Sequence, residues 1–189
     1  RNPIYLNFQE SKKLLSNIDS NSKYYLRDYC IVSLFLNCAL RLSELCSIDL
    51  NDIDWDSNTL KIIGKGDKER LIFLNNMVLS SLKEYLKDRS TYKINADDKN
   101  ALFISSRGCR ISNRAIQLLI KKYTKGFEKN ITPHKLRHTS ATLMFKHGKV
   151  DIRTLQKVLG HENISTTQIY THVDDDGIKK AFESNPLNF

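Results

Sequence analysis

The chain has 189 residues, of which 40% are apolar, so it can bury a hydrophobic core within a single domain. No apolar run reaches about 18 residues, which excludes a membrane-spanning helix, and the opening residues do not resemble a signal peptide. We therefore expect a cytoplasmic protein with no membrane partner. The formal net charge of +9 favours a polyanionic partner, most often a nucleic acid.

The positive charge is concentrated in the second half of the chain. Between Arg107 and Arg137, nine Lys or Arg residues stand against Glu128 alone, whereas residues 49–56 hold four aspartates and no base. This asymmetry favours DNA binding by the second half. A solvated helix face is the alternative, because the lysines within 121–125 fit the wet side of one helix.

The four cysteines are expected to be reduced and mostly buried thiols. Three of them recur at spacings of eight residues in one apolar region, which is too wide for the ligand pairs of a zinc knuckle. The four are Cys30, Cys38, Cys46 and Cys109.

The first half of the chain predicts two helices and a hairpin. Residues 24–40 are apolar nearly all round, which is typical of a buried helix. A short helix is expected from Ser43, with the serine hydroxyl as its N-cap. Over residues 59–74, the runs "TLKII" and "RLIFL" flank a polar, glycine-containing connection, the pattern of a β-hairpin. The run "LFIS" at residues 102–105 predicts a third strand.

Helical periodicity begins again at residues 111–123, "ISNRAIQLLIKKY". Four apolar side chains of this segment share one helical face: Ile116, Leu119, Ile120 and Tyr123.

Three more helices are expected after this one. Thr132 followed by Pro133 indicates a helix start, and Gly148 suits its C-terminal end. A second helix runs from Asp151 to Gly160, and Ser165 is expected to cap a third. The inward residues of the first are Leu136, Leu143 and Met144. The fold class is therefore mixed, mainly α-helical with a small antiparallel β-sheet.

The helix start at Thr132 carries two candidates for anion binding. His134 and Arg137 are three residues apart and lie on one helical face, near the unpaired amides and the positive end of the helix dipole. A phosphate fits this arrangement. The alternative is an exposed helix start with no ligand.

Four further motifs carry residues suited to the same chemistry: Arg41 in "ALRLSEL", Lys65 in "GKGDKER", His161 in "LGHENIS" and Tyr170 in "IYTH". Together with "HKLRHTSAT", in this order, they make the chain resemble the tyrosine recombinase family, also called the phage integrase family. The resemblance runs from about Tyr5 to Val173 and is closest to Xer-like recombinases and mobile-element integrases. It implies the tyrosine recombinase catalytic-domain fold.

The resemblance assigns the central roles to two arginines and a tyrosine. Tyr170 attacks the scissile phosphate, while Arg41 and Arg137 hold its non-bridging oxygens. Arginine suits this task because its planar fork binds phosphate in a bidentate manner and neutralises the charge of the transition state. No metal and no cofactor are implied. Without its context, Tyr170 would be read as a core tyrosine.

The same resemblance assigns proton transfer to two other residues and a phosphate contact to a third. His134 assists deprotonation of the tyrosine, His161 hydrogen-bonds the phosphate and Lys65 protonates the departing 5′ oxygen. A lysine serves as a general acid when its neighbours lower its pKa. A flexible, exposed turn lysine is the alternative for Lys65.

Two supporting residues and one departure from the family complete the expected site. Glu44 lies one turn beyond Arg41 and can buttress it, with a surface carboxylate as the alternative. His138 is expected to support the core or backbone. Ala39 stands where the family usually has glycine, and a positive φ there costs alanine about 1 kcal/mol.

DNA contacts outside the catalytic residues are expected from polar and basic side chains near the motifs. The candidates are Lys68, Arg107, Arg110, Asn113, Arg114 and Lys135.

The expected domain organisation has three parts. Residues 1–12 form a linker from a missing N-terminal DNA-binding domain, residues 13–173 the catalytic domain, and residues 174–189 a C-terminal tail. An apolar face of Ile178, Ala181 and Phe182 predicts a tail helix, which the resemblance places on a neighbouring subunit. A disordered end is the alternative.

The predicted function is site-specific recombination of double-stranded DNA through a 3′-phosphotyrosyl intermediate. The resemblance implies a homotetramer on DNA, and we expect a monomer when the chain is free. It serves integration or excision of a mobile element, or chromosome-dimer resolution. The alternatives are a non-catalytic DNA-binding module of the same fold and a type IB topoisomerase-like relaxing enzyme.

Overall fold

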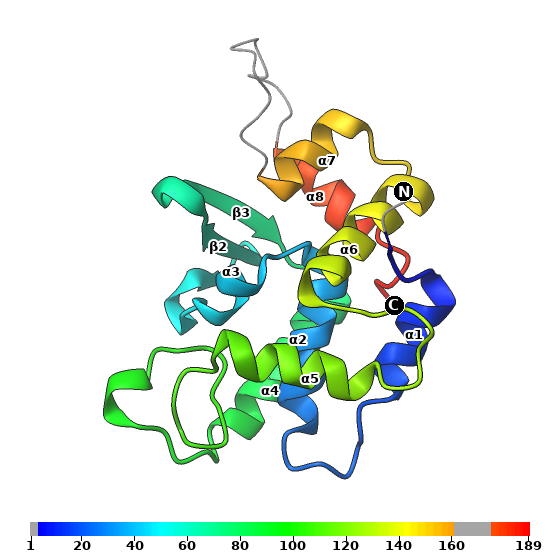
Figure 1. The fold of residues 1–189 in the computed structure, drawn as a ribbon. Coiled ribbons are helices and arrows are strands. Elements are labelled where there is room, and N and C mark those ends of the chain that lie inside the picture. The colour runs from blue at the N-terminus through cyan, green and yellow to red at the C-terminus, as the bar shows by residue number, and fades with distance from the viewer. Residues whose placement is uncertain (1–3, 161–174) are drawn as a thin grey trace.

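The computed structural model describes residues 4–160 and 175–189 (Figure 1). Its α-helices are α1 (Phe8–Ser16), α2 (Tyr25–Cys38), α3 (Leu42–Cys46), α4 (Asn76–Arg89), α5 (Asn113–Tyr123), α6 (Pro133–His147), α7 (Ile152–Leu159) and α8 (Asp175–Glu183). Its strands are β1 (Ile53–Asp54), β2 (Thr59–Ile63) and β3 (Glu69–Phe73). Short 3-10 turns lie at Leu50–Asp52, Lys65–Asp67 and Ala96–Asp98. The predicted fold class, mainly helical with a small antiparallel sheet, is confirmed.

Helix α2 is the centre of the hydrophobic core, as its apolar sequence predicts. Residues from Cys30 to Cys38 are all buried, and the helix packs against α4 and α6. Cys30, Cys38 and Cys46 are buried free thiols, and Cys109 is a partly exposed one, in agreement with the sequence. Burial raises the pKa of the Cys46 thiol to about 11, so this thiol is protonated and unreactive at neutral pH.

The end of α2 is a sharp, buried corner. Ala39 has φ 53° and ψ 42°, the left-handed conformation, and its side chain is fully buried. The positive φ that would make alanine costly here is therefore present. The corner ends α2 and places Arg41 directly ahead of α3, as its N-cap.

Helix α3 begins two residues earlier than predicted, since its N-cap is Arg41 and not Ser43. Leu42 is its first residue, so Ser43 lies inside the helix and its hydroxyl is not the N-cap. The Glu44 carboxylate instead accepts a hydrogen bond from the Arg41 backbone N–H at 2.8 Å. The start of the helix is therefore stabilised by the carboxylate of Glu44, at the third helical position, and not by the Ser43 hydroxyl.

The three-stranded antiparallel sheet has the order β1-β2-β3. Strands β2 and β3 form the predicted hairpin, with Ile62 opposite Arg70, and the hairpin turn holds Lys65. The predicted third strand at residues 102–105 is wrong, because β1 takes that place. The segment makes only an isolated bridge, between Ile104 and Arg110. The Tyr85 hydroxyl donates to Leu102 O at 2.9 Å and accepts from Ile104 N at 3.2 Å.

Helices α5 and α6, which carry much of the basic segment between Arg107 and Arg137, form as predicted. Ser112 caps α5, and the face of Ile116, Leu119, Ile120 and Tyr123 is buried. Thr132 caps α6 by accepting from the Lys135 backbone N–H at 3.3 Å, with Pro133 in the first turn. The predicted inward residues of α6, Leu136, Leu143 and Met144, are buried.

Helix α6 ends at Gly148 as predicted, but for a different reason. Gly148 has an ordinary right-handed φ of −83°, and the left-handed residue is Lys149 with φ 52°. A Cβ on Gly148 would lie 2.3 Å from the Ser184 hydroxyl, so glycine is needed for close packing of the C-terminal segment.

Helix α7 is capped by Asp151 and ends at Gly160, as predicted. Helix α8 packs against α7 and β3 of the same chain, with Ala181 and Phe182 buried (Figure 1). Docking of this tail on a neighbouring subunit stays a prediction. The expected helix capped by Ser165 lies outside the described residues.

The segment ahead of α1 is attached to α6. The Leu6 backbone N–H donates to the Thr139 hydroxyl at 3.0 Å, and Leu6 itself is fully buried. Lys146 donates to the Tyr5 hydroxyl at 2.7 Å. Packing therefore begins before residue 12, and a linker function for residues 1–12 stays a prediction. Of the helices within residues 4–160 and 175–189, none has the length and apolar character that crossing a membrane requires.

We predict opposite outcomes for two substitutions at Ala39. Ala39→Gly relieves about 1–2 kcal/mol of left-handed strain but loses a buried methyl and gains unfolded-state entropy, so the free energy of unfolding changes by less than about 1 kcal/mol. Ala39→Val adds β-branching at a positive φ inside the core and costs more than about 2 kcal/mol. Urea unfolding measures both. A tolerated valine would contradict the left-handed corner.

Candidate active site

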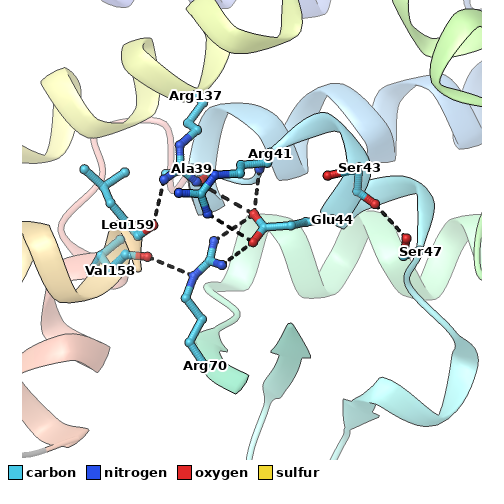
Figure 2. A network of polar contacts seen from close by, with 9 residues as sticks. All are labelled: Ala39, Arg41, Ser43, Glu44, Ser47, Arg70, Arg137, Val158 and Leu159. Atoms are coloured by element: carbon cyan, nitrogen blue, oxygen red, sulfur yellow. Dashed lines mark hydrogen bonds and ion pairs between the residues drawn. The ribbon is translucent and has the colours of Figure 1, made fainter. Parts of the chain in front are cut away.

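Three arginine side chains converge on the carboxylate of Glu44 (Figure 2). Arg41 comes from the corner between α2 and α3, Arg70 from β3 and Arg137 from the second turn of α6. The Glu44 side chain is only 3% exposed. Segments far apart in the sequence therefore meet at one buried negative charge.

Arg41 is the most exposed of the three. Its guanidinium lies 3.4 Å from the Glu44 carboxylate, while its side chain is 40% exposed. Glu44 accepts from both the backbone and the side chain of Arg41. The predicted buttressing role of Glu44 thus has the right geometry, and the alternative of a surface carboxylate is wrong.

Arg137 is buried and held by two backbone carbonyls. Its Nη1 donates to Ala39 O and its Nη2 to Leu159 O, each at 2.6 Å. Its guanidinium lies 3.8 Å from the Glu44 carboxylate. The left-handed corner and the end of α7 therefore both orient this arginine.

Arg70 is the member of the cluster that the sequence reasoning missed. Both of its terminal nitrogens donate to Glu44, and its Nε donates to Val158 O at 3.3 Å. A signal was present in the sequence. Arg70 lies two residues before the inward Ile72 on β3 and therefore on the same face, so a charged residue occupies an inward position of a strand.

The electrostatics of the cluster favour an anion. Burial pushes the pKa of Glu44 upward, but the hydrogen bonds and charge of Arg70, with the Arg41 contacts, outweigh it and hold this pKa below its ordinary value. Burial, together with the charges of Arg41 and Arg70, lowers the pKa of the Arg137 guanidinium to about 10. Three positive charges around one negative leave a net positive site at neutral pH.

A cavity of about 500 Å³ lies beside this cluster. The first turn of α6 forms one wall and α5 another, so the positive end of the α6 dipole accompanies the guanidinium groups. The structure thus brings together three predicted catalytic residues, Arg41, His134 and Arg137. The described lining residues are Arg41, Leu42, Ser43, Asn113, Gln117, Thr132, Pro133, His134 and Arg137.

Gln117 is a second residue that the sequence reasoning missed. It lies one turn after Asn113 on α5, and both side chains line the cavity. The spacing of four residues on a helix is the signal that was available.

The hairpin lysines lie apart from the described lining of the cavity. Lys65 is exposed at the turn of the hairpin, and Lys68 is exposed where the turn ends. His138 packs edge-on against Tyr5 at 6.0 Å, and burial, with the nearby His134, lowers its pKa. This contact fits the supporting role predicted for His138.

The other DNA-facing candidates differ in their surroundings. Arg107 and Arg114 are exposed. Arg110 donates to Cys46 O and to Ile48 O, each at 3.0 Å, and pairs with the Asp49 carboxylate. Lys135 donates to Asn130 O. The contacts of Arg110 stabilise the end of α3, and DNA binding by these residues stays a prediction.

His161 and Tyr170 lie outside the described residues. The last described position before them is Gly160, a left-handed C-terminal cap with φ 66° that directly follows α7. Because Arg70 and Arg137 bind the Val158 and Leu159 carbonyls, the segment leading to His161 starts at the arginine cluster.

Comparison with known proteins identifies the family. The sequence profile described as the phage integrase family matches residues 5–176. The chain belongs to the phage integrase family. A curated relative, tyrosine recombinase XerC of Caldanaerobacter subterraneus subsp. tengcongensis, is 53% identical over 191 residues, covering 100% of this chain and 52% of the relative. Tyrosine recombinase XerC of Shewanella amazonensis is 38% identical over 188 residues, covering 93% and 62%. The chain therefore spans about half to two thirds of the length of these relatives.

Solved structures of integrase-family recombinases have the same fold. A crystal structure of XerA recombinase matches with a TM-score of 0.76 and 31% identity, covering 100% of this chain and 68% of that one. The XerH site-specific recombinase bound to its difH substrate, in a pre-cleavage complex, matches with a TM-score of 0.69 and 29% identity, covering 90% and 50%. The predicted catalytic-domain fold is thereby confirmed.

We predict that Glu44→Gln lowers the free energy of unfolding by about 3 kcal/mol, because it removes the negative partner of buried guanidinium groups. Since the folded-state pKa of Glu44 is depressed, its stabilising contribution is present above about pH 4.3 and is lost as pH falls further. The variant should therefore lose part of the acid dependence of stability.

A matched control is Glu84→Gln on α4. Glu84 pairs with Lys87 at 3.3 Å on the surface, and removing this pair costs less than about 1 kcal/mol. Urea unfolding across pH measures both variants. Equal stabilities of the two would contradict the buried cluster.

Proposed function

We propose that this chain is the catalytic part of a tyrosine-type site-specific DNA recombinase. The observation that carries the proposal is the convergence of Arg41, His134 and Arg137 on one cavity beside a net positive cluster. Membership of the phage integrase family supports it, as does similarity to tyrosine recombinases and to a recombinase solved with its DNA substrate.

The proposed reaction is a transesterification at a DNA phosphodiester. The Tyr170 hydroxyl oxygen bonds to the phosphorus, the bond to the 5′ oxygen breaks, and the departing strand keeps a 5′-hydroxyl. A 3′-phosphotyrosyl bond conserves the energy of the broken ester. A 5′-hydroxyl from a partner strand then attacks this bond and releases the tyrosine, so no ATP is consumed.

The roles of the described side chains follow from their chemistry. Arg41 and Arg137 bind the non-bridging oxygens and stabilise the charge of the pentavalent transition state, which is usually the largest catalytic contribution. His134 takes part in removing the tyrosine proton. Lys65, on the hairpin turn, is the proposed proton donor to the 5′ oxygen, and His161 a donor to the phosphate.

The proposed partner is double-stranded DNA, bound by four copies of the protein during strand exchange. This places the activity in the bacterial cytoplasm, on the nucleoid. The same chemistry serves either chromosome-dimer resolution or the movement of a mobile element. A type IB topoisomerase-like activity would relax supercoils without recombinant products.

We predict a covalent protein–DNA adduct on nicked suicide duplexes. A library of duplexes with randomised flanks supplies the unknown DNA target site. The short fragment downstream of the cleaved phosphate diffuses away, so the strand cannot be rejoined and the covalent intermediate accumulates. Tyr170→Phe should give no adduct. Arg41→Ala and Arg137→Ala should each slow adduct formation by at least about 100-fold, the scale of lost transition-state contacts.

Tyr25→Phe is the matched control for the nucleophile. Tyr25 is a partly buried tyrosine of α2, away from the cavity, so its variant should react like the wild type. The measurement is a denaturing gel of labelled DNA. Absence of an adduct with the full gene product would refute the enzyme and favour a non-catalytic DNA-binding module.

We predict that DNA binding weakens steeply with salt. With two or more phosphate contacts, each contributing about −0.9 to the log–log slope, Kd should rise at least about tenfold between about 50 and 200 mM salt. Arg114→Gln should reduce the slope by about 1. Lys87→Gln on α4, which contributes no described residue to the cavity lining, is the control. Fluorescence anisotropy measures both, and a flat salt dependence would contradict phosphate-dominated binding.

A further inference from the structure

We infer that Arg70 is a positioning residue, which acts through Glu44 to hold Arg41 and Arg137 in place for the phosphate. The inference rests on the proposed function. It assigns a role to a hairpin residue that is not among the described lining residues of the cavity.

Arg70 makes a bidentate contact with Glu44. Its Nη1 donates to one carboxylate oxygen and its Nη2 to the other at 3.0 Å, and the Arg70 side chain is only 13% exposed (Figure 2). Each of these carboxylate oxygens also lies near a second arginine: Oε2 is 3.4 Å from Arg41 and Oε1 is 3.8 Å from Arg137. The fork of Arg70 therefore sets the plane of the carboxylate that the other two arginines face.

The third donor of Arg70 binds a different element. Its Nε donates to Val158 O in the last turn of α7, and the next carbonyl, Leu159 O, accepts from Arg137. One side chain thus connects the β3 strand, the start of α3 and the end of α7. Displacement of Arg70 would shift the carboxylate and the carbonyl together.

The backbone around Arg70 leaves room for this side chain. A Cβ on Gly160 would lie 2.9 Å from Arg70 Cδ, and Gly160 also has a positive φ of 66°. A Cβ on Gly64 would lie 3.4 Å from the Glu44 carboxylate and 3.8 Å from Arg70 Nη1. Gly64, the first residue of "GKGDKER", and Gly160, the residue before His161, therefore both border the ion pair of Arg70 and Glu44.

The charge balance explains why an arginine is needed there. A buried carboxylate is costly unless its charge and its lone pairs are satisfied. The guanidinium groups of Arg41 and Arg137 lie farther from Glu44 than the fork of Arg70 does, and Arg137 donates two of its hydrogen bonds to backbone carbonyls. If Arg70 neutralises Glu44, the charges of Arg41 and Arg137 stay available for a phosphate. A lysine has the charge but lacks the planar fork.

The test compares hairpin variants in single-turnover cleavage of a nicked suicide duplex, using the full gene product. Arg70→Met should slow cleavage about 10–100-fold, the usual range for partners that orient a reactive group, with Kd for DNA within about twofold of wild type. Arg70→Lys should recover only part of the rate, because the fork is missing. Lys61→Met is the control, since Lys61 is an exposed cation on the opposite face of the same hairpin.

A double variant separates positioning from loss of folding. Arg70→Met leaves the Glu44 carboxylate without its bidentate partner, so adding Glu44→Gln should make the double variant less impaired than the product of the two single effects. If Arg70→Met does not fold, the folded Arg70→Lys variant decides through its cleavage rate. A wild-type rate for Arg70→Lys would overturn the bidentate role.

A substrate with a sulfur leaving group tests whether Arg70 acts through Arg41 and Arg137 or through Lys65. With a 5′-bridging phosphorothiolate, the departing thiolate needs no proton, so the defect of Lys65→Ala should largely disappear. The defect of Arg70→Met should remain, because the phosphate is still held by misplaced arginines. Full rescue of Arg70→Met would overturn the inference, because it would show that Arg70 supports proton donation by Lys65. Failure of wild type to form any adduct would instead overturn the proposed function.

Discussion

The buried carboxylate of Glu44 is the constraint on which the site depends. A charge that is 3% exposed is stable in a protein only when cations and hydrogen-bond donors surround it closely. Here the donors come from the α2–α3 corner, the hairpin and α6, so none of these elements can move independently of the others. The arginines outnumber the carboxylate, and the excess positive charge faces the cavity beside α6. The same ion pairs that stabilise the fold thus prepare a site for a phosphodiester.

The backbone corners of this chain serve the same cluster. The left-handed conformation of Ala39 turns its carbonyl toward Arg137, and the left-handed Gly160 ends α7 where Arg70 approaches. Ala39 keeps its left-handed backbone although the conformation is strained for alanine, and its methyl group is fully buried. At these two positions, an unusual backbone conformation lies directly beside a fixed guanidinium group.

Much of the fold follows from patterns along the sequence, and part of it does not. The capping residues and apolar periodicity of α5, α6 and α7 predict those helices closely, and the order of the motifs predicts that Arg41, His134 and Arg137 meet. The strand expected at residues 102–105 does not form, because this segment makes only an isolated bridge and the Tyr85 hydroxyl binds the Leu102 carbonyl and the Ile104 N–H. Arg70 was missed for a related reason: its partner Glu44 lies on another element, and only the fold shows that an inward strand position meets a buried carboxylate.

The attachment of the N-terminal segment to α6 gives the site a mechanical connection. Leu6 is hydrogen-bonded to Thr139, only two residues after Arg137, and Tyr5 is held by Lys146 on the same helix. A polypeptide joined ahead of Ile4 is therefore attached, through these two hydrogen bonds, to the helix that bears His134 and Arg137. An N-terminal fusion tag on this protein is therefore better separated from Ile4 by a flexible spacer, so that the tag does not disturb the hydrogen bonds of Tyr5 and Leu6 to α6.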